Sequence, residues 1–264
     1  MFESFRYFKC GRQSQKMIHR RSPTRLRWLV ILVPVTAIAI AVAVILIVFT
    51  RPATSRASAR TEVSPTISPV GAMASSFGSG VTTLSVNPQH KGDVLVVMAE
   101  SDYSAVRLSF VTGGGVVAWV PALQHVGTSE PRAYSIWYGT VAFPGAWTIS
   151  FQWSGLITGH NAEYEAQEFS GGTGWYLDGA GSLDNPASTT VSFPRLIPSN
   201  EGDLYFAYAD YPTSPARGTP DGYTFTITPD GNQIAYGARA QEPPRSSLPS
   251  AAPSTTVAIL LASV

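Results

Sequence analysis

Hydrophobic and polar residues alternate along several short stretches of the second half of the chain. The stretch 146–153 reads AWTISFQW, with aromatic and aliphatic side chains on one face and threonine, serine and glutamine on the other. A period of two residues over eight positions predicts a half-buried β-strand. The same alternation recurs in 133–141, 203–209 and 223–228, so these stretches are predicted as strands too.

One stretch, 93–99, is apolar on both faces and predicts a central strand that is covered on two sides. Further strands are predicted at 81–86, 105–111, 115–120, 162–169, 188–193, 232–239 and 255–263. The Pro- and Ser-rich stretch 241–254 is interpreted as a surface loop before the last strand. After residue 50, no stretch has apolar residues at the spacing of an amphipathic helix. The sequence therefore predicts an all-β, antiparallel β-sandwich or jelly-roll-like domain over 71–264.

An uncharged run of 22 residues covers 28–49. As a helix it would be roughly 33 Å long, enough to cross a hydrocarbon core of about 30 Å. Trp28 and Phe49 stand at its two ends, where aromatic rings favour the membrane interface. Residues 1–27 carry eight basic side chains and one acidic one. The positive-inside rule predicts a cytoplasmic tail there and an extracellular domain after the span.

The stretch 50–70 is rich in Ser, Thr, Pro and Ala and is interpreted as a linker. The alternative to an uncleaved anchor is a signal peptide cut after the small residues 57–59, although 22 residues is long for its apolar core. The expectation is a single-pass protein of the cell membrane, with the lipid bilayer as the partner of residues 28–49.

The charge of the outer part argues against nucleic acid as a partner, because residues 61–264 hold seven basic and sixteen acidic side chains. A single cysteine, Cys10, excludes a disulfide framework. The Asp-Gly pairs at 221–222 and 230–231 are interpreted as hairpin turns and not as calcium ligands, because no spaced acidic loop surrounds them. His90, His125 and His160 lack ligand spacing, so neither a metal nor a cofactor is expected.

Several pieces of the outer part resemble poorly characterised bacterial and phage surface modules with a β-sandwich fold. These pieces are GDVLVVMAES at 92–101, SIWYGTV at 135–141, AWTISFQW, EFSGGTGWYLDG at 168–179, GDLYFAYAD at 202–210 and the last apolar strand. The resemblance covers about 75–264. It implies an extracellular module used for display or adhesion, and it carries over no catalytic residue.

Two kinds of candidate binding residue stand out. In a strand through HNAEYEAQE, Glu163 and Glu165 share one face, whereas Glu168 shares the other with apolar residues and is expected to point inward. A second acid near Glu168, such as Asp178, would make the pair that glycosidases use. The alternative is a carboxylate that accepts hydrogen bonds from a neighbouring loop.

The adjacent aromatic residues Trp175 and Tyr176 cannot both face the core of a sheet, so we expect an exposed ring there and another at Tyr211, beside Pro212. The alternative is that these rings cover an edge of the domain. The leading hypothesis is a non-enzymatic adhesion module for an envelope glycan or a membrane protein. A carbohydrate-active hydrolase using Glu168 and a structural subunit of an envelope complex are the other hypotheses.

Overall fold

The computed structural model describes 66–128, 131–172, 174–199, 202–211, 218, 222–238 and 242–264. The chain divides into two compact units, Met1–Arg60 and Thr61–Val264. The segment 28–49 lies outside the described residues, as do Trp28 and Phe49. Within the described part, no helix is long and apolar enough to cross a bilayer. All regular structure there is β, and all strand pairs are antiparallel, so the all-β prediction is confirmed.

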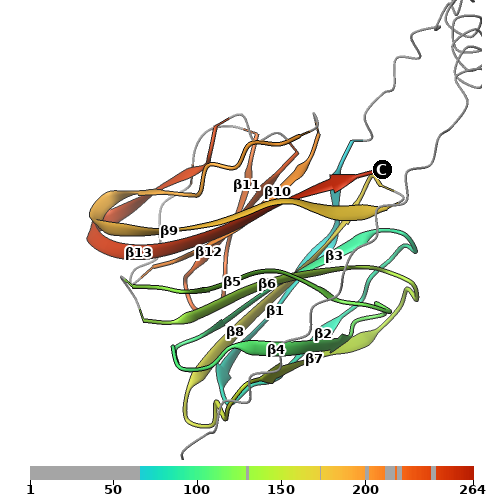
Figure 1. The fold of residues 1–264 in the computed structure, drawn as a ribbon, viewed down its shortest axis with the longest axis horizontal. Helices are drawn as coiled ribbons and strands as arrows, with labels where there is room; N and C mark the ends of the chain where they lie inside the picture. The colour runs from blue at the N-terminus through green and yellow to red at the C-terminus, as the bar shows by residue number, and fades with distance from the viewer. Residues whose placement is uncertain are drawn as a thin grey trace, which may run out of the picture. The chain divides into compact units, whose positions relative to one another are not determined.

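The strands form three sheets that lie as layers in Figure 1. The central sheet has the order β1-β8-β3-β6-β5. Its strands are β1 (Ser68–Ser79), β8 (Asn161–Ser170), β3 (Val94–Ser101), β6 (Ala133–Thr140) and β5 (Val120–Val126).

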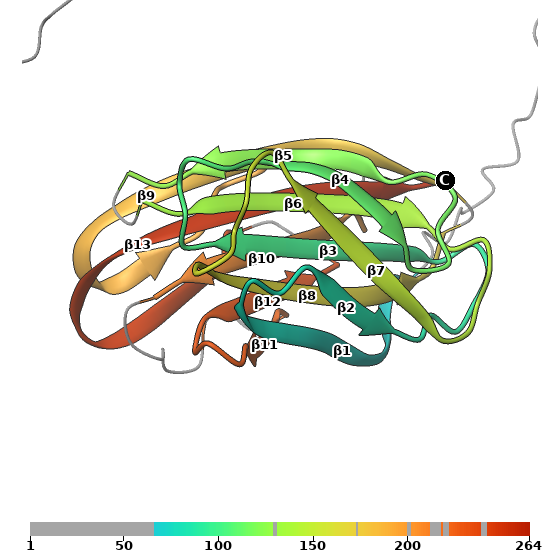
Figure 2. The same ribbon diagram turned by 90° about the horizontal axis from the view of Figure 1, so that it is seen from below.

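Two outer sheets flank the central one. The large outer sheet has the order β11-β12-β10-β13-β9, with bounds Thr224–Ile227, Gln233–Gly237, Leu204–Asp210, Arg245–Ser263 and Trp175–Ser192. The small outer sheet has the order β2-β7-β4, with bounds Thr83–Val86, Trp147–Trp153 and Leu108–Gly113. Figure 2 shows β7 running obliquely across the strands of the central sheet.

The central sheet is buried on both faces. Along β3, Leu95 and Val97 pack into a hydrophobic cluster shared with the small outer sheet. Val96 and Met98 alternate with them and pack into a second cluster, shared with the large outer sheet. All eight residues of β3 are buried. The expectation that 93–99 is a strand covered on both sides is therefore confirmed. The run is apolar on both faces because one outer sheet packs against each face.

Two boundaries predicted from composition are wrong. Strand β1 begins at Ser68, inside the stretch 50–70 that was interpreted as a linker, because Ser68 and Pro69 pair with Ser170 and Phe169 of β8. Strand β13 begins at Arg245, so most of 241–254 is strand and not loop.

The start of β13 pairs with the end of β9 through register shifts near its prolines. Proline lacks a backbone donor, and a bulge is where a sheet tolerates it. Ser246 and Leu248 alternate inward there, a pattern too short to stand out among the prolines. The prediction of a strand at 115–120 is wrong by several residues, because β5 begins at Val120. Within 115–119, Val116 makes an isolated bridge to Val141.

We predict that substitutions on both faces of β3 destabilise the domain. Leu95→Ala and Met98→Ala should each lower the free energy of unfolding by about 2–5 kcal/mol, because each leaves a cavity in a different hydrophobic cluster. Ser150→Ala, on the exposed face of β7, should change it by less than about 0.5 kcal/mol. Urea unfolding measures all three. A small effect for either β3 variant would mean that one face of the strand is not a packed core.

Candidate functional site

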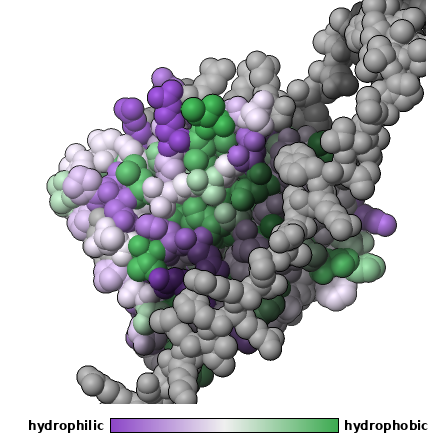
Figure 3. All heavy atoms as spheres, viewed as in Figure 1, coloured by the Kyte–Doolittle hydropathy of each residue, from purple (hydrophilic) through white to green (hydrophobic). Residues whose placement is uncertain are grey.

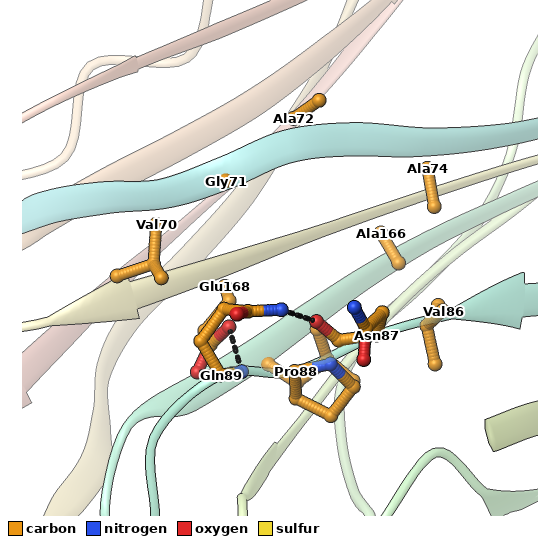
Figure 4. Close-up of a pocket in the computed structure, with 11 residues that line it drawn as sticks. Val70, Gly71, Ala72, Ala74, Val86, Asn87, Pro88, Gln89, Ala166 and Glu168 are labelled. Carbon is orange, nitrogen blue, oxygen red and sulfur yellow. Dashed lines mark hydrogen bonds between the residues drawn. The ribbon is translucent and has the colours of Figure 1, made fainter. Parts of the chain in front are cut away.

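Glu168 points from β8 toward the loop that joins β2 to β3, as Figure 4 shows. Its oxygens accept hydrogen bonds from the backbone N–H of Gln89 at 2.7 and 3.0 Å and from that of His90 at 3.0 Å. The side chain is buried and borders a cavity of about 260 Å³ between β1, β8 and this loop. The inward orientation expected from the sequence is confirmed, and so is the bonding to a neighbouring loop.

Asp93 is the acidic side chain that lies beside Glu168, whereas Asp178 lies elsewhere, bonded to Ser199. Burial and the Glu168 carboxylate raise the pKa of Asp93, although a hydrogen bond from His90 opposes them. Asp178 accepts hydrogen bonds from Ser199, and these lower its pKa. Since both Glu168 oxygens already accept backbone N–H groups, this geometry is that of a carboxylate that fixes a loop.

Trp175 and Tyr176 begin β9, at the end of the sheets where the last strand finishes, because Trp175 pairs with Ser263. The Trp175 indole N–H donates to the carbonyl of Gly92 at 3.1 Å, which fixes the ring. Its ring packs beside the second hydrophobic cluster. Tyr176 is the exposed member of the pair, at 41%. The expectation of one exposed ring is confirmed at Tyr176.

The expectation that Tyr211 is exposed is wrong. Its side chain is only 5% exposed and lies in a third hydrophobic cluster, on the outer face of the large outer sheet. Phe193 and Leu248 belong to the same cluster and cover that face. The Tyr211 hydroxyl donates to Gln233 at 3.4 Å. The ring is therefore part of the packing, and no pattern in the sequence predicts that this face is covered.

Trp175 forms one wall of a groove of about 460 Å³. We call this the Trp175 groove; its lining residues are Lys91, Gly92, Val117, Ala118, Val120, Tyr138, Gly139, Thr140, Val141, Ala142 and Trp175. The lining is mostly apolar, and Lys91 is its one charged side chain. Val117 is 76% exposed and Val120 is 40% exposed, so the groove opens to solvent.

A second group of polar side chains lies between the central and large outer sheets, at the opposite end of β3. We call it the acid cluster; its members are Glu100, Arg132, Glu163, Glu165, Tyr208, Asp210, Asp230 and Asn232. Five of these eight side chains are acidic and one is basic. The alternation along β8 predicts that Glu163 and Glu165 share a face, but it does not predict that a second sheet buries that face.

Arg132 partly neutralises the acid cluster. Its Nη1 donates to Glu100 Oε1 at 2.9 Å, and its Nε lies 3.2 Å from Asp210 Oδ2. Asp230 Oδ2 is farther away, at 3.9 Å. Tyr134 also donates to Asp210 Oδ2, at 2.5 Å. The guanidinium thus neutralises Glu100 and Asp210 more effectively than Asp230.

Glu163 is held by three donors. Its Oε1 accepts from the backbone N–H of Asp230 at 3.0 Å, and its Oε2 accepts from Asn232 at 2.9 Å and from the Tyr208 hydroxyl at 2.9 Å. The same hydroxyl lies 2.8 Å from Glu100 Oε2. A hydroxyl has one hydrogen, so it can donate to only one of these two carboxylates.

Two sets of side chains bring possible metal ligands within 4.8 Å of one another among the described residues. The first consists of His90, Asp93 and Glu168, and there the Glu168 oxygens already bond backbone N–H groups. The second consists of Glu100, Glu163 and Asp230. The Asp-Gly pair at 230–231 does form the turn between β11 and β12, as predicted, with Gly231 at a φ of 90°.

The acid cluster should make stability fall as pH rises. Burial and the Asp210 carboxylate raise the pKa of Glu100 to about 8, against the opposing effect of Arg132. Burial raises the pKa of Glu165 as well. Between the ordinary value of 4.5 and about 8 the folded chain therefore keeps a proton on Glu100 that the unfolded chain has released.

We predict that the free energy of unfolding decreases with pH across this window, by up to about 1.4 kcal/mol per pH unit for each such group. Urea unfolding from about pH 5 to about pH 8, in buffer freed of divalent cations, measures the slope. Glu100→Gln should reduce it, because the variant side chain does not titrate. A stability that rises with pH would contradict the raised pKa.

Comparison with known proteins gives no match, since no family model, curated protein or solved structure resembles this chain. The resemblance to surface modules therefore stays an expectation drawn from short sequence pieces. The Trp175 groove, the acid cluster and the surroundings of Glu168 are the three structural features that bear on function.

Proposed function

We propose that this chain is a single-pass, membrane-anchored surface protein whose β-sandwich domain binds an envelope glycan without cleaving it. The apolar run at 28–49 is the anchor, with the N-terminus in the cytoplasm. The three layered sheets supply a rigid body with its own hydrophobic clusters. The observation that carries the proposal is the Trp175 groove.

The Trp175 groove has the size and lining of a ligand site. Small-molecule sites commonly have volumes of about 300–1,000 Å³, mostly apolar walls and few polar groups, and this groove of about 460 Å³ fits that description. The bond from Trp175 to Gly92 holds an aromatic wall in place before any ligand arrives. Lys91 offers a cation for the carboxylate or phosphate of an acidic glycan.

The other two hypotheses have weaker support. A hydrolase would need Glu168 to hold or release a proton, whereas both its oxygens accept backbone N–H groups. A structural subunit that assembles by sheet extension would need an open strand edge. Edge strands β5 and β9 contain Pro121 and Pro186, residues that discourage pairing with another strand. Edge strands β2, β4 and β11 contain no proline, but each has only four to six residues, which offers a short edge for pairing.

We predict that a charge in the groove weakens glycan binding. The full-length chain, purified in detergent, would be co-sedimented with insoluble cell-envelope polysaccharide, and the supernatant would be assayed for released sugar. Val117→Glu should reduce the bound fraction so that the apparent Kd rises about tenfold, because an apolar wall then carries a carboxylate. No sugar should be released. Val117 is largely exposed, so this substitution should leave folding intact.

Leu156→Glu is the matched control, since Leu156 is 84% exposed and does not line the groove. It should bind like the unmodified chain. An equal loss of glycan binding in both variants would show that the added charge acts non-specifically. It would argue against the groove as the binding site. If the unmodified chain neither binds nor releases sugar, the glycan proposal fails, and a membrane protein becomes the partner to search for.

A further inference from the structure

Glu165 is a buried carboxyl group without a donor. It is fully buried in β8, and neither of its oxygens has a hydrogen-bond partner. It shares a face of β8 with Glu163, and the carboxylates of Glu163 and Glu100 act on it electrostatically. An unpartnered carboxylate at such a position costs several kcal/mol unless a proton or a cation compensates it.

The acid cluster as a whole also has fewer donors than its carboxylates require. Arg132 provides one positive charge beside five acidic side chains. Tyr208 has one hydrogen for two carboxylate oxygens, at 2.8 and 2.9 Å. If Glu163 takes that hydrogen, Glu100 Oε2 lacks a donor, whereas Glu163 Oε2 keeps the Asn232 amide if Glu100 takes it. A proton on Glu100, or a cation that replaces this proton between Glu100 and Glu163, would satisfy the unpaired oxygen.

A space suited to an ion lies beside these oxygens. A cavity of about 140 Å³ is lined by Phe77, Glu100, Asp102, Arg132, Asn161, Ala162, Glu163 and Asp230. The side chains of Asp102 and Asp230 are 33% and 30% exposed, so the cavity has a mouth lined by acids and a buried end at Glu100 and Glu163. An ion from solvent can reach the buried oxygens through this mouth.

We propose that Glu100, Glu163 and Asp230 bind a calcium ion in this cavity, next to the buried carboxyl group of Glu165. Calcium prefers oxygen ligands at about 2.3–2.6 Å in irregular geometry. Two ligands on opposite sides of such an ion stand roughly 4.8 Å apart, and the ligand atoms of these three residues all lie within 4.8 Å of one another. No nitrogen or sulfur ligand is in the set, which disfavours zinc and copper.

Calcium fits these surroundings better than magnesium. Magnesium requires near-ideal octahedral geometry and gives up its water reluctantly. The three carboxylates come from β3, β8 and the turn between β11 and β12, and two of them are fixed by Arg132 and Asn232. Asp102 and Asn161 line the same cavity and offer further oxygen atoms at its mouth. The site is independent of the Trp175 groove, which lies at the other end of β3.

The test uses the full-length chain, purified in detergent and stripped of divalent cations, at about pH 9. This lies above the pKa of about 8 that burial gives Glu100, so Glu100 is available as a carboxylate ligand. Calcium is titrated while the melting temperature is followed, and terbium, which emits when a nearby tyrosine transfers energy to it, serves as a second probe. Calcium should raise the melting temperature by several degrees and displace terbium with an apparent Kd below about 1 mM. Magnesium should be at least about tenfold weaker.

Asp230→Asn is the decisive variant, because its side chain lies at the mouth and its backbone N–H to Glu163 is kept. It should fold, and it should raise the apparent Kd for calcium at least about tenfold. Glu163→Gln should do the same, although loss of buried hydrogen bonds could unfold it. Glu242→Gln removes an equal charge at an exposed position outside the cavity and should bind calcium like the unmodified chain.

Two results would overturn the proposal. One is the absence of any calcium-dependent rise in melting temperature up to about 10 mM calcium. The other is an Asp230→Asn variant whose metal-free melting temperature and calcium affinity both equal those of the unmodified chain. Loss of calcium binding in Asp230→Asn with retention in Glu242→Gln would support it. Glycan co-sedimentation does not enter either result, so the proposed function and the calcium site are tested separately.

Discussion

The central sheet is buried on both faces, and this double burial decides where the domain can hold polar side chains. Because β3 and β8 have a hydrophobic cluster on each side, every polar residue in them needs a partner from another strand or loop. Glu168 finds two backbone donors on the side of the small outer sheet. Glu163 finds three donors on the other side, whereas Glu165 finds none. The unusual chemistry of the domain therefore arises where a doubly covered sheet contains acids.

Local pattern was sufficient to predict most strands, because period-two alternation reflects one buried face and the all-apolar run 93–99 reflects two. Pattern failed where proline and serine hid the alternation, at the start of β13. It also predicted neither β1, which pairs with a strand a hundred residues away, nor the first part of β9. The inward direction of Glu168 could be predicted from its position in β8. The acid cluster could not be predicted, because Glu100, Asp210 and Asp230 come from three separate segments. The one available signal was that two apolar strands, 94–101 and 204–210, each have an acid at or near their end.

The two candidate sites occupy opposite ends of the central sheet. The Trp175 groove lies where β3 begins, near the last residues of β13, and the acid cluster lies where β3 ends. The coloured part of the face in Figure 3 shows apolar and polar residues interspersed. The Trp175 groove is distinguished by its mostly apolar lining and by its fixed aromatic wall. Such a separation allows an ion to stabilise one end of the body while a ligand binds at the other.

Amide hydrogen exchange of the full-length chain shows whether the central sheet is buried on both faces, because exchange reports how well each strand is covered. If the central sheet is buried on both faces, the amides of β3, β6 and β8 should exchange together, slowest of all, and only through global unfolding. The amides of the edge strands β2 and β11 should exchange faster through local opening. Exchange of the β3 amides at the rate of these edge strands would contradict the account.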